Sequence, residues 1–412
     1  MAKLSDILRE RGYVYQQSAE TLEEITDGEK RTVYLGVDPT ADSIHLGNFA
    51  QYMFLRRFAE AGHKVILIIG GGTALAGDPK PDVERELTDA SVVAARAEKL
   101  KSQAKKILGD VELELVNNAD WLTKLNLMEF LRETGKYFTV NNLVKKDAIN
   151  ARMESEGGIS FTEFSYPLLQ AYDFWHLYKT YGCNVQIGGS DQWGNIIAGV
   201  DLIRKKEGGE AFALSSPLII EKSTGKKFGK SEGNAIWLDA EKTSPFAFYQ
   251  FFFNVEDAMV EELLFKMTLL SKTDIDNVLQ NTNPGDRLGQ RTLAENVTSI
   301  VHGAEAAHAA ARISSVLFGS GIAELSQEEI DLLKKEAPTY VVTQYLNPID
   351  VVVGAGLASS KTEARNFINA GSVTLDGVVV AGSSNLANMI EKTGGIGVMK
   401  RGKRNVCVLT LS

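Results

Sequence analysis

Cysteine, histidine and long apolar runs are scarce in this chain of 412 residues, and each scarcity argues against a class of protein. The two cysteines, Cys183 and Cys407, lie far apart and cannot make a disulfide framework or a cysteine-rich zinc site. The five histidines form no paired ligand motif, so no protein-bound metal is expected. No run reaches the roughly 18 apolar residues of a membrane span, and the first residues lack the apolar core of a signal peptide. We therefore expect a cytoplasmic protein without a membrane segment.

The composition is that of an ordinary globular protein. Hydrophobic residues make up 44% of the chain and charged residues 24%, which argues against a disordered chain. The net charge of −9 excludes a uniformly basic binder of nucleic acid but leaves room for a local basic patch. At about 150 residues per domain, the length predicts two or three domains.

The first part of the chain alternates short β-rich runs with longer helical patterns. The strands are expected at 33–37, 65–70, 113–117 and 185–188, and the helices at 45–61, 83–108, 162–181 and 192–204. Continuous apolar strands separated by helices are typical of a parallel sheet buried on both faces. The sequence thus predicts an α/β, doubly wound (Rossmann-like) domain over 1–243, with inserted connecting helices and ligands at the carboxyl ends of its strands.

The remainder of the chain reads as two further domains. An all-α domain is expected over 244–330, and a charged linker containing Pro338 over 331–347. Residues 348–412 are expected to form a small α+β domain, with a tight hairpin turn at Asp376-Gly377. This last domain carries a net charge of +3, whereas the rest of the chain carries −12. This asymmetry favours a domain that contacts a polyanion over one whose charges only keep the protein in solution.

The segment 38–48 follows a strand and opens a helix. The first N–H groups of a helix are unpaired and attract phosphate, and Thr40 and His45 add donors there. Gly47 has no side chain, so a flat group such as a purine can approach the backbone. Taken alone, an ordinary capped helix with a surface histidine explains this segment equally well.

The segment 225–233 places Lys227 and Lys230 three residues apart among glycines. This arrangement predicts a mobile cationic loop that clamps a pyrophosphate during nucleotidyl transfer. A solvated turn rich in lysine and glycine is the structural alternative for this segment by itself.

The two segments together are the two-part mark of class I aminoacyl-tRNA synthetases. Between them, five stretches narrow the resemblance: 34–42, 77–79, 159–166, 169–173 and 186–195. Over its whole length the chain closely resembles the bacterial tyrosyl-tRNA synthetases, and its last domain looks like an RNA-binding domain also found in a small-subunit ribosomal protein. The resemblance implies a homodimeric tyrosine–tRNA ligase that activates L-tyrosine with ATP. Tyrosyl-adenylate and pyrophosphate form first, and the tyrosyl group then passes to the terminal adenosine of tRNA(Tyr).

The resemblance also implies a tyrosine site. In that family, the matches to Asp78, Tyr166 and Gln170 hold the substrate ammonium, and the matches to Tyr34 and Asp173 hold the phenol hydroxyl. Tyr166, Gln170 and Asp173 are spaced so that one helical face presents all three. The structural alternative is a helix face that packs in the core. It would explain Tyr166 but not the polar residues Gln170 and Asp173 on the same face.

For ATP and the adenylate, the resemblance implies contacts from Gly36, Asp38, Gly47, Gly188, Asp191, Gln192, Leu218, Ile219 and Lys230. For catalysis it implies Thr40, His45, Asn48, Arg85, Lys227 and Lys230, which stabilise the leaving pyrophosphate. Asn48 replaces the family's second histidine and keeps a donor amide. Arg85 fits the family's mobile-loop arginine, but the partner lysine is out of register, and Lys80 is no more than a candidate to replace it. Gln51 is assigned no role.

For tRNA, the resemblance implies Lys145, Lys146, Arg204 and Lys205 at the acceptor stem, and the basic cluster of Lys400, Arg401, Lys403 and Arg404 lies in the last domain. An exposed helix face explains the first group equally well. Mg²⁺ is expected to arrive with ATP, held mainly by phosphate. The apolar stretch 159–164 fits a dimer interface or a core.

Two other functions remain open at this point. A tryptophan-specific relative shares the fold, although Tyr34 with Asp173 favours a phenol over an indole, which has no acceptor. A non-catalytic RNA-binding protein with a synthetase-like body is the other, although Lys227 and Lys230 argue against it.

Overall fold

The computed structural model describes residues 2–80, 84, 86–231, 234–283, 285–318, 325–343, 346–402 and 405–412. The chain divides into two compact units. Unit 1 comprises Met1–Thr243 and Glu256–Pro284, and unit 2 comprises Ser244–Val255 and Gly285–Ser412. Helices α12 (Asp257–Met267) and α13 (Lys272–Asn281), which fall in the predicted all-α domain, therefore group with unit 1. The limits of the three predicted domains remain predictions.

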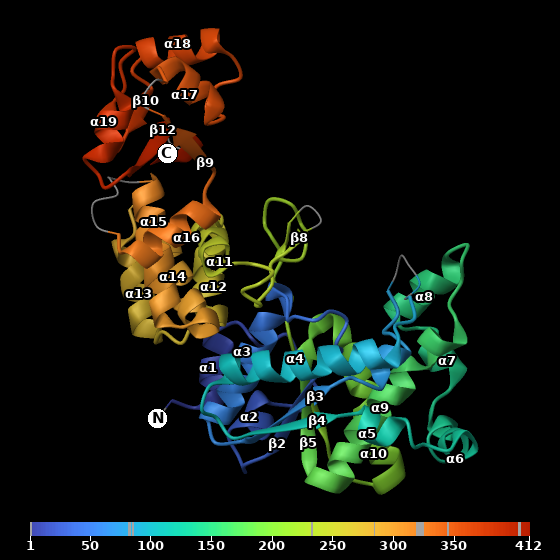
Figure 1. Ribbon diagram of the computed structural model, residues 1–412. Helices are drawn as coiled ribbons and strands as arrows, with labels where there is room; N and C mark the ends of the chain where they lie inside the picture. Colours follow the sequence, from blue (N-terminus) through green and yellow to red (C-terminus); the bar gives the residue numbers. More distant parts are fainter. Residues whose placement is uncertain are drawn as a thin grey trace. The chain divides into compact units, whose positions relative to one another are not determined.

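A six-stranded sheet forms the centre of unit 1 (Figure 1). Its strands are β1 (Gln16–Gln17), β2 (Thr32–Val37), β3 (Lys64–Ile69), β4 (Leu113–Asn117), β5 (Cys183–Gly189) and β6 (Phe212–Ser216). Their order is β1-β6-β5-β2-β3-β4, and all neighbours run parallel except β1 with β6. The chain order reverses between β2 and β5, which opens a crevice at the carboxyl ends of these strands. The predicted doubly wound α/β fold is confirmed.

The sheet is buried because its strands carry apolar side chains on both faces. On one face Tyr34, Ile66 and Ile68 pack with Phe174 and Leu177 of α9 (Phe161–Tyr181). Helix α10 (Trp193–Glu207) joins this layer, while α3 (Leu46–Glu60) and α4 (Ala90–Leu108) also contact the sheet. Because side chains alternate along a strand, the intervening residues are buried on the other face.

The remaining elements of unit 1 are short. The helices are α1 (Leu4–Glu10), α2 (Leu22–Thr26), α5 (Ala119–Leu122), α6 (Leu127–Glu133), α7 (Val140–Leu143) and α8 (Asp147–Glu154), with 3-10 turns at Thr73–Leu75, Gly135–Tyr137 and Ser190–Gln192. Strands β7 (Lys230–Ser231) and β8 (Asn234–Ala235) form a small hairpin. Figure 1 shows α6, α7 and α8 along one edge of unit 1.

The structure differs from the sequence analysis at the start of α4 and at β6. Helix α4 begins at Ala90 and not at 83, because the Asp89 side chain accepts a hydrogen bond from the Ser91 backbone N–H and caps the helix there. Strand β6 was not predicted. Its sequence, Phe-Ala-Leu-Ser-Ser, ends in two serines, yet all five residues are buried between β5 and β1.

Unit 2 begins with helices. They are α11 (Pro245–Phe253), α14 (Leu288–His302), α15 (Ala304–Phe318) and α16 (Gln327–Glu336). Helix α11 contacts α14 and α15, and four of its aromatic side chains are buried: Phe246, Phe248, Tyr249 and Phe252. Within the described residues, no helix of the chain is long and apolar enough to cross a membrane.

The end of unit 2 is a five-stranded sheet with three helices, as the α+β prediction requires. Its strands are β9 (Thr339–Val342), β10 (Val373–Leu375), β11 (Val378–Val379), β12 (Ile396–Arg401) and β13 (Asn405–Leu411), and its helices are α17 (Pro348–Gly354), α18 (Lys361–Asn369) and α19 (Leu386–Glu391). The hairpin turn at Asp376-Gly377 is confirmed, with positive φ at both residues. Strand β9 pairs with β13, so part of the predicted linker 331–347 belongs to this sheet.

Candidate active site

A cavity of about 300 Å³ opens at the carboxyl ends of β2 and β5. Among the described side chains, it gathers every predicted catalytic, tyrosine and ATP residue: Tyr34, Gly36, Asp38, Thr40, His45, Gly47, Asn48, Asp78, Tyr166, Gln170, Asp173, Gly188, Asp191, Gln192, Leu218, Ile219 and Lys227. Arg85 lies outside the described residues, and Lys230 is described only as backbone in β7. The cavity brings these residues together, and their individual roles remain predictions.

A buried carboxylate and a buried hydroxyl lie at one end of the cavity. Asp173 on α9 is 3% exposed and accepts hydrogen bonds from Asn118 Nδ2 at 2.8 Å and Trp121 Nε1 at 2.7 Å. Tyr34 on β2 is 1% exposed, and its hydroxyl has no hydrogen-bond partner among the described residues. Burial, with the nearby Asp173 charge, raises the pKa of Tyr34 well above its usual value. This end of the cavity is therefore built to receive a group that both donates and accepts a hydrogen bond.

Burial raises the pKa of Asp173 to about 7, and the hydrogen bonds from Asn118 and Trp121 oppose this rise. Between about pH 4 and pH 7 the native state then holds a proton that the unfolded chain has lost, so stability falls as the pH rises. In Asp173→Asn this contribution is absent. Relative to wild type, the variant's free energy of unfolding should increase by up to roughly 1.4 kcal/mol per pH unit across that window. Denaturant unfolding of both proteins at pH 5 and pH 8 measures the difference, and parallel pH profiles would contradict it.

A second carboxylate, Asp38, is held from two sides. Tyr166 donates its hydroxyl hydrogen to Asp38 Oδ2 at 2.8 Å, and Thr73 donates to Oδ1 at 2.7 Å. Gly70 makes room for this arrangement, since a Cβ atom there would lie 1.9 Å from Asp38 Oδ1. Burial and the charges of Asp38 and Asp78 raise the pKa of Tyr166 well above its usual value, so Tyr166 is a neutral donor.

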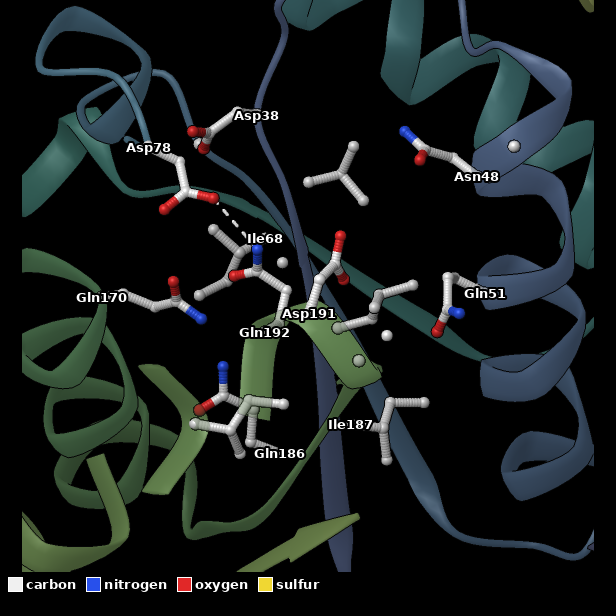
Figure 2. A pocket seen from close by; sticks show the side chains of 18 of the residues that line it. Asp38, Asn48, Gln51, Ile68, Asp78, Gln170, Gln186, Ile187, Asp191 and Gln192 are labelled. Carbon is white, nitrogen blue, oxygen red and sulfur yellow. Dashed lines mark hydrogen bonds between the residues drawn. The ribbon is translucent and has the colours of Figure 1, made fainter. Parts of the chain in front are cut away.

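A third carboxylate, Asp78, is bound by amides of the β5–α10 segment. Gln192 Nε2 donates to Asp78 Oδ2 at 3.0 Å, and Asn195 Nδ2 lies 3.3 Å from both Asp78 Oδ1 and Gln192 Oε1. Figure 2 shows Asp38, Asp78 and Asp191 with the amides of Gln170, Gln186 and Gln192 around one shared space. This grouping is suited to a cationic ammonium group.

Three amide oxygens of the cavity are buried and lack a hydrogen-bond partner among the described residues. They belong to Gln51, Gln170 and Gln186. The Gln51 amide nitrogen donates to Ser216 Oγ at 2.7 Å, which orients that side chain. Buried acceptors without partners are costly, so these oxygens are expected to accept hydrogen bonds from a ligand.

The cationic loop closes on the start of α3. Lys227 Nζ forms an ion pair with Asp191 Oδ2 at 2.9 Å. Gly229 has a φ of +81°, and a Cβ atom there would lie 3.0 Å from Leu46 Cβ, so only glycine lets the loop approach this closely. His45 precedes α3, and its ring meets the Trp237 ring edge-on at 6.3 Å. The two segments identified from the sequence are thus brought together.

Comparison with known proteins gives the chain a family. A model of class I tRNA synthetases (W and Y) matches residues 26–319, and a model of the tyrosine–tRNA ligase SYY-like C-terminal domain matches 329–409. Tyrosine–tRNA ligase 1 of Bacillus subtilis is 43% identical, and the tyrosine–tRNA ligase of Roseiflexus castenholzii is 42% identical, each alignment covering 100% of both chains. The chain belongs to the tyrosine–tRNA ligases of class I.

Solved structures agree with this assignment. A C-terminally truncated mitochondrial tyrosyl-tRNA synthetase of Aspergillus nidulans is 31% identical, with a TM-score of 0.70 over 77% of this chain and 95% of that one. The predicted enzyme class is confirmed. The tryptophan-specific alternative is set aside, because the C-terminal model and both full-length relatives are tyrosine–tRNA ligases.

The basic residues predicted to contact tRNA have different surroundings in this ligase. Lys145 is exposed, whereas the Lys146 ammonium donates to the Gly194 carbonyl and burial lowers the pKa of Lys146 to about 8. Arg204 pairs with Asp201 at 2.7 Å, and Lys205 donates to the Tyr137 carbonyl at 3.3 Å.

In the last domain, partial burial lowers the pKa of Lys400, and Arg401 stacks on Phe367 at 4.6 Å. Lys403 and Arg404 lie outside the described residues.

Sequence reasoning missed several residues that line this ligase's cavity or hold the side chains that do. Asn118 and Trp121 follow the end of β4, where a parallel sheet presents ligand-binding groups, and that position was a usable signal. Gln186 belongs to the stretch 186–195 that carries the family resemblance, but the sequence analysis assigned it no role. Thr73 gave no signal, because only the 3-10 turn that follows β3 directs its hydroxyl to Asp38.

Proposed function

We propose that this cavity carries out both steps of the tyrosine–tRNA ligase reaction. Tyrosine would lie with its phenol at Asp173 and Tyr34 and its ammonium at Asp78, Tyr166 and Gln170. The observation that carries the proposal is the pair of groups at the buried end, where the Asp173 carboxylate is an acceptor and the Tyr34 hydroxyl has no hydrogen-bond partner among the described residues. A phenol is the substrate side chain that satisfies both.

ATP would extend from Leu218 and Ile219, which offer an apolar seat for adenine, past Asp191 toward Thr40 and His45. The tyrosine carboxylate attacks the α-phosphorus in line, an O–P bond forms, and the bond to pyrophosphate breaks. No protein group becomes a nucleophile. Catalysis is by positioning and by charge stabilisation of the leaving group from Thr40, His45 and the lysines of the loop.

Mg²⁺ would enter with ATP, bound mainly by phosphate oxygens. The structure supports this arrangement, because the carboxylates of Asp38, Asp78 and Asp191 each already accept from neighbouring side chains. Within the described ranges, no three His, Cys, Asp or Glu groups are arranged to hold a metal ion. The ion would offset the charge of the triphosphate.

In the second step a ribose hydroxyl of the terminal adenosine of tRNA(Tyr) attacks the carbonyl of the adenylate, and AMP leaves. The basic C-terminal domain would bind tRNA, since the net charge of residues 348–412 is +3. A cytoplasmic location goes with this function, because charged tRNA is consumed there.

Removing the C-terminal domain is expected to separate the two steps. Because β9 belongs to the C-terminal sheet, the truncation should begin at Pro338 and not at Pro348. Tyrosyl-adenylate formation should stay within about twofold of wild type, whereas tRNA charging should fall strongly, because the phosphate contacts that make tRNA binding salt-sensitive are lost. The truncated Aspergillus relative keeps the same fold, so the remaining chain is expected to fold. Charging at the wild-type rate in moderate salt would show that the domain is no essential tRNA contact.

We also propose a homodimer. Large apolar side chains are exposed between α6 and the start of α9, and they include Leu127, Met128, Val140 and Phe161, the last with 76% of its surface exposed. Such clustering is typical of a surface that another chain covers. Sedimentation equilibrium measures the molar mass directly, and a monomer at micromolar concentration would contradict the proposal.

The decisive experiment is exchange of radiolabelled pyrophosphate into ATP. It should depend on tyrosine and not on tryptophan. Absence of exchange with both amino acids would leave the non-catalytic RNA-binding protein as the correct function.

A further inference from the structure

A second cavity, of about 320 Å³, adjoins the first. Asp38, Thr40 and Asp78 line both cavities, so the two meet at the segment that follows β2. Arg96 of α4 lines only the second cavity. No role for Arg96 was suggested by the sequence, because it lies in the middle of a long helix, far from either phosphate-binding segment.

Helix α4 presents one face to this segment. Arg96 Nη1 donates to the Thr40 carbonyl at 3.2 Å, Lys99 pairs with Asp42 at 3.5 Å, and Gln103 Oε1 accepts from the Ile44 backbone N–H at 2.8 Å. These residues recur at helical spacing, so one rigid helix follows the chain from Thr40 to the start of α3. Arg96 itself lies between the buried residues Val93 and Ala97, which fixes its Cα position.

The Arg96 guanidinium has donors to spare. It carries five N–H groups, and among the described residues it makes one hydrogen bond, to Thr40. The other N–H groups are available to a planar or tetrahedral oxyanion beside Thr40, and guanidinium is well suited to phosphate. Arg96 therefore combines a fixed position with free donor capacity.

Acidic side chains outnumber basic ones around the second cavity, so each cation there matters to an anion that enters. Its described lining includes four acidic residues, Asp38, Asp78, Glu84 and Glu86, and two basic ones, Lys80 and Arg96. Lys80 comes from the loop after Asp78, whereas Arg96 comes from a helix. Arg96 supplies one of the two positive charges on this described lining, and removing it would leave one basic residue against four acidic ones in the path of a pyrophosphate leaving past Thr40.

We propose that Arg96 is a further catalytic residue, which binds the leaving pyrophosphate beside Thr40 and supplies the positive charge that the out-of-register loop lysine does not. This inference rests on the proposed function, because it assumes that ATP is cleaved between its α- and β-phosphates in the first cavity. Breaking that bond moves charge onto the oxygen that bridged the α- and β-phosphates, which becomes a terminal oxygen of pyrophosphate, and Arg96 stabilises this charge together with Lys227.

The test compares Arg96→Ala and Arg96→Gln with wild type in single-turnover experiments on the full chain. Three quantities are measured: the tyrosine Kd, the rate of adenylate formation, and the pyrophosphate Kd in the reverse reaction on preformed tyrosyl-adenylate. In both variants we expect adenylate formation to slow about 10-fold and the pyrophosphate Kd to rise about 10-fold, with the tyrosine Kd unchanged. The effect should be smaller than for an enclosed donor because Arg96 is partly exposed to screening.

Arg96→Gln distinguishes direct binding of pyrophosphate by Arg96 from structural support of the segment at Thr40. Its amide can still donate to the Thr40 carbonyl but carries no charge, so wild-type behaviour in Arg96→Gln with a defect only in Arg96→Ala would overturn the proposal. A pyrophosphate Kd within twofold of wild type in both variants would also overturn it. Lys99→Ala is the matched control, because Lys99 contacts the same segment but lines neither cavity. Wild type lacking tyrosine-dependent exchange would instead refute the proposed function.

Discussion

Replacing Lys227 by alanine is expected to slow tyrosyl-adenylate formation about 100- to 1,000-fold and to leave the tyrosine Kd nearly unchanged. Loss of one preorganised donor to a developing negative charge typically has this effect. Lys227 lines the cavity and is held at 2.9 Å from Asp191, on the side where ATP would lie. When the triphosphate binds, its ammonium can exchange the carboxylate for phosphate oxygens, and the interaction strengthens as pyrophosphate departs.

Rapid-quench measurement of the first turnover, with tyrosine binding followed separately, checks this expectation. Lys226→Ala is the matched control, because the neighbouring lysine is exposed and does not line the cavity. If Lys227→Ala forms the adenylate at the rate of Lys226→Ala, Lys227 has no part in charge stabilisation. A rise in the tyrosine Kd alone would place Lys227 in amino-acid binding.

Replacing Asp173 by alanine is expected to reduce kcat/KM for tyrosine and to narrow the discrimination between tyrosine and phenylalanine about 10- to 100-fold. The two amino acids differ only in the hydroxyl, and Asp173 is the buried acceptor at that end of the cavity. A buried polar group left unpaired costs about 1–3 kcal/mol, and phenylalanine leaves Asp173 without a ligand partner. With alanine in place, that penalty against phenylalanine disappears, while tyrosine loses its acceptor.

The measurement is kcat/KM for both amino acids in ATP–pyrophosphate exchange, in wild type and variant. Asp120→Ala removes an exposed carboxylate from α5 and should leave the ratio unchanged. Because Asp173→Ala also leaves the donors of Asn118 and Trp121 unpaired, the variant's folding should be checked by circular dichroism. An equal tyrosine-to-phenylalanine ratio in wild type and variant would place the hydroxyl-reading group elsewhere.

Much of the site could be predicted because its residues lie where elements begin or end. Asp38 and Thr40 follow β2, His45 precedes α3, and Asp191 and Gln192 join β5 to α10. A parallel sheet collects the carboxyl ends of its strands at one edge, so segments far apart in the sequence meet there. The order of the strands then determines which segments are neighbours, and that order came from the structure.

Other features depended on packing that no local pattern encodes. Strand β6 lacks a long apolar run and becomes a strand because β5 and β1 offer hydrogen-bonding edges on both sides. The sequence left a tRNA contact and an exposed helix face as equal interpretations of Lys146, and neither included the contact that its ammonium makes with the Gly194 carbonyl of α10. At the start of α18, Ser360 Oγ accepts from the Glu363 N–H, while the Glu363 carboxylate accepts from the Ser359 N–H.

The sequence alone determined the α/β class, the two segments predicted to bind phosphate, and the spacing of Tyr166, Gln170 and Asp173 on one helical face, because each depends on neighbours within a few turns of chain. Only the tertiary structure decided what surrounds those residues. Asn118 and Trp121 hold Asp173, Asn195 lies between Asp78 and Gln192, and Arg96 contacts Thr40 from 56 residues away. Burial and hydrogen-bond partners arise when distant segments pack, so pKa values and donor capacity are properties of the folded chain.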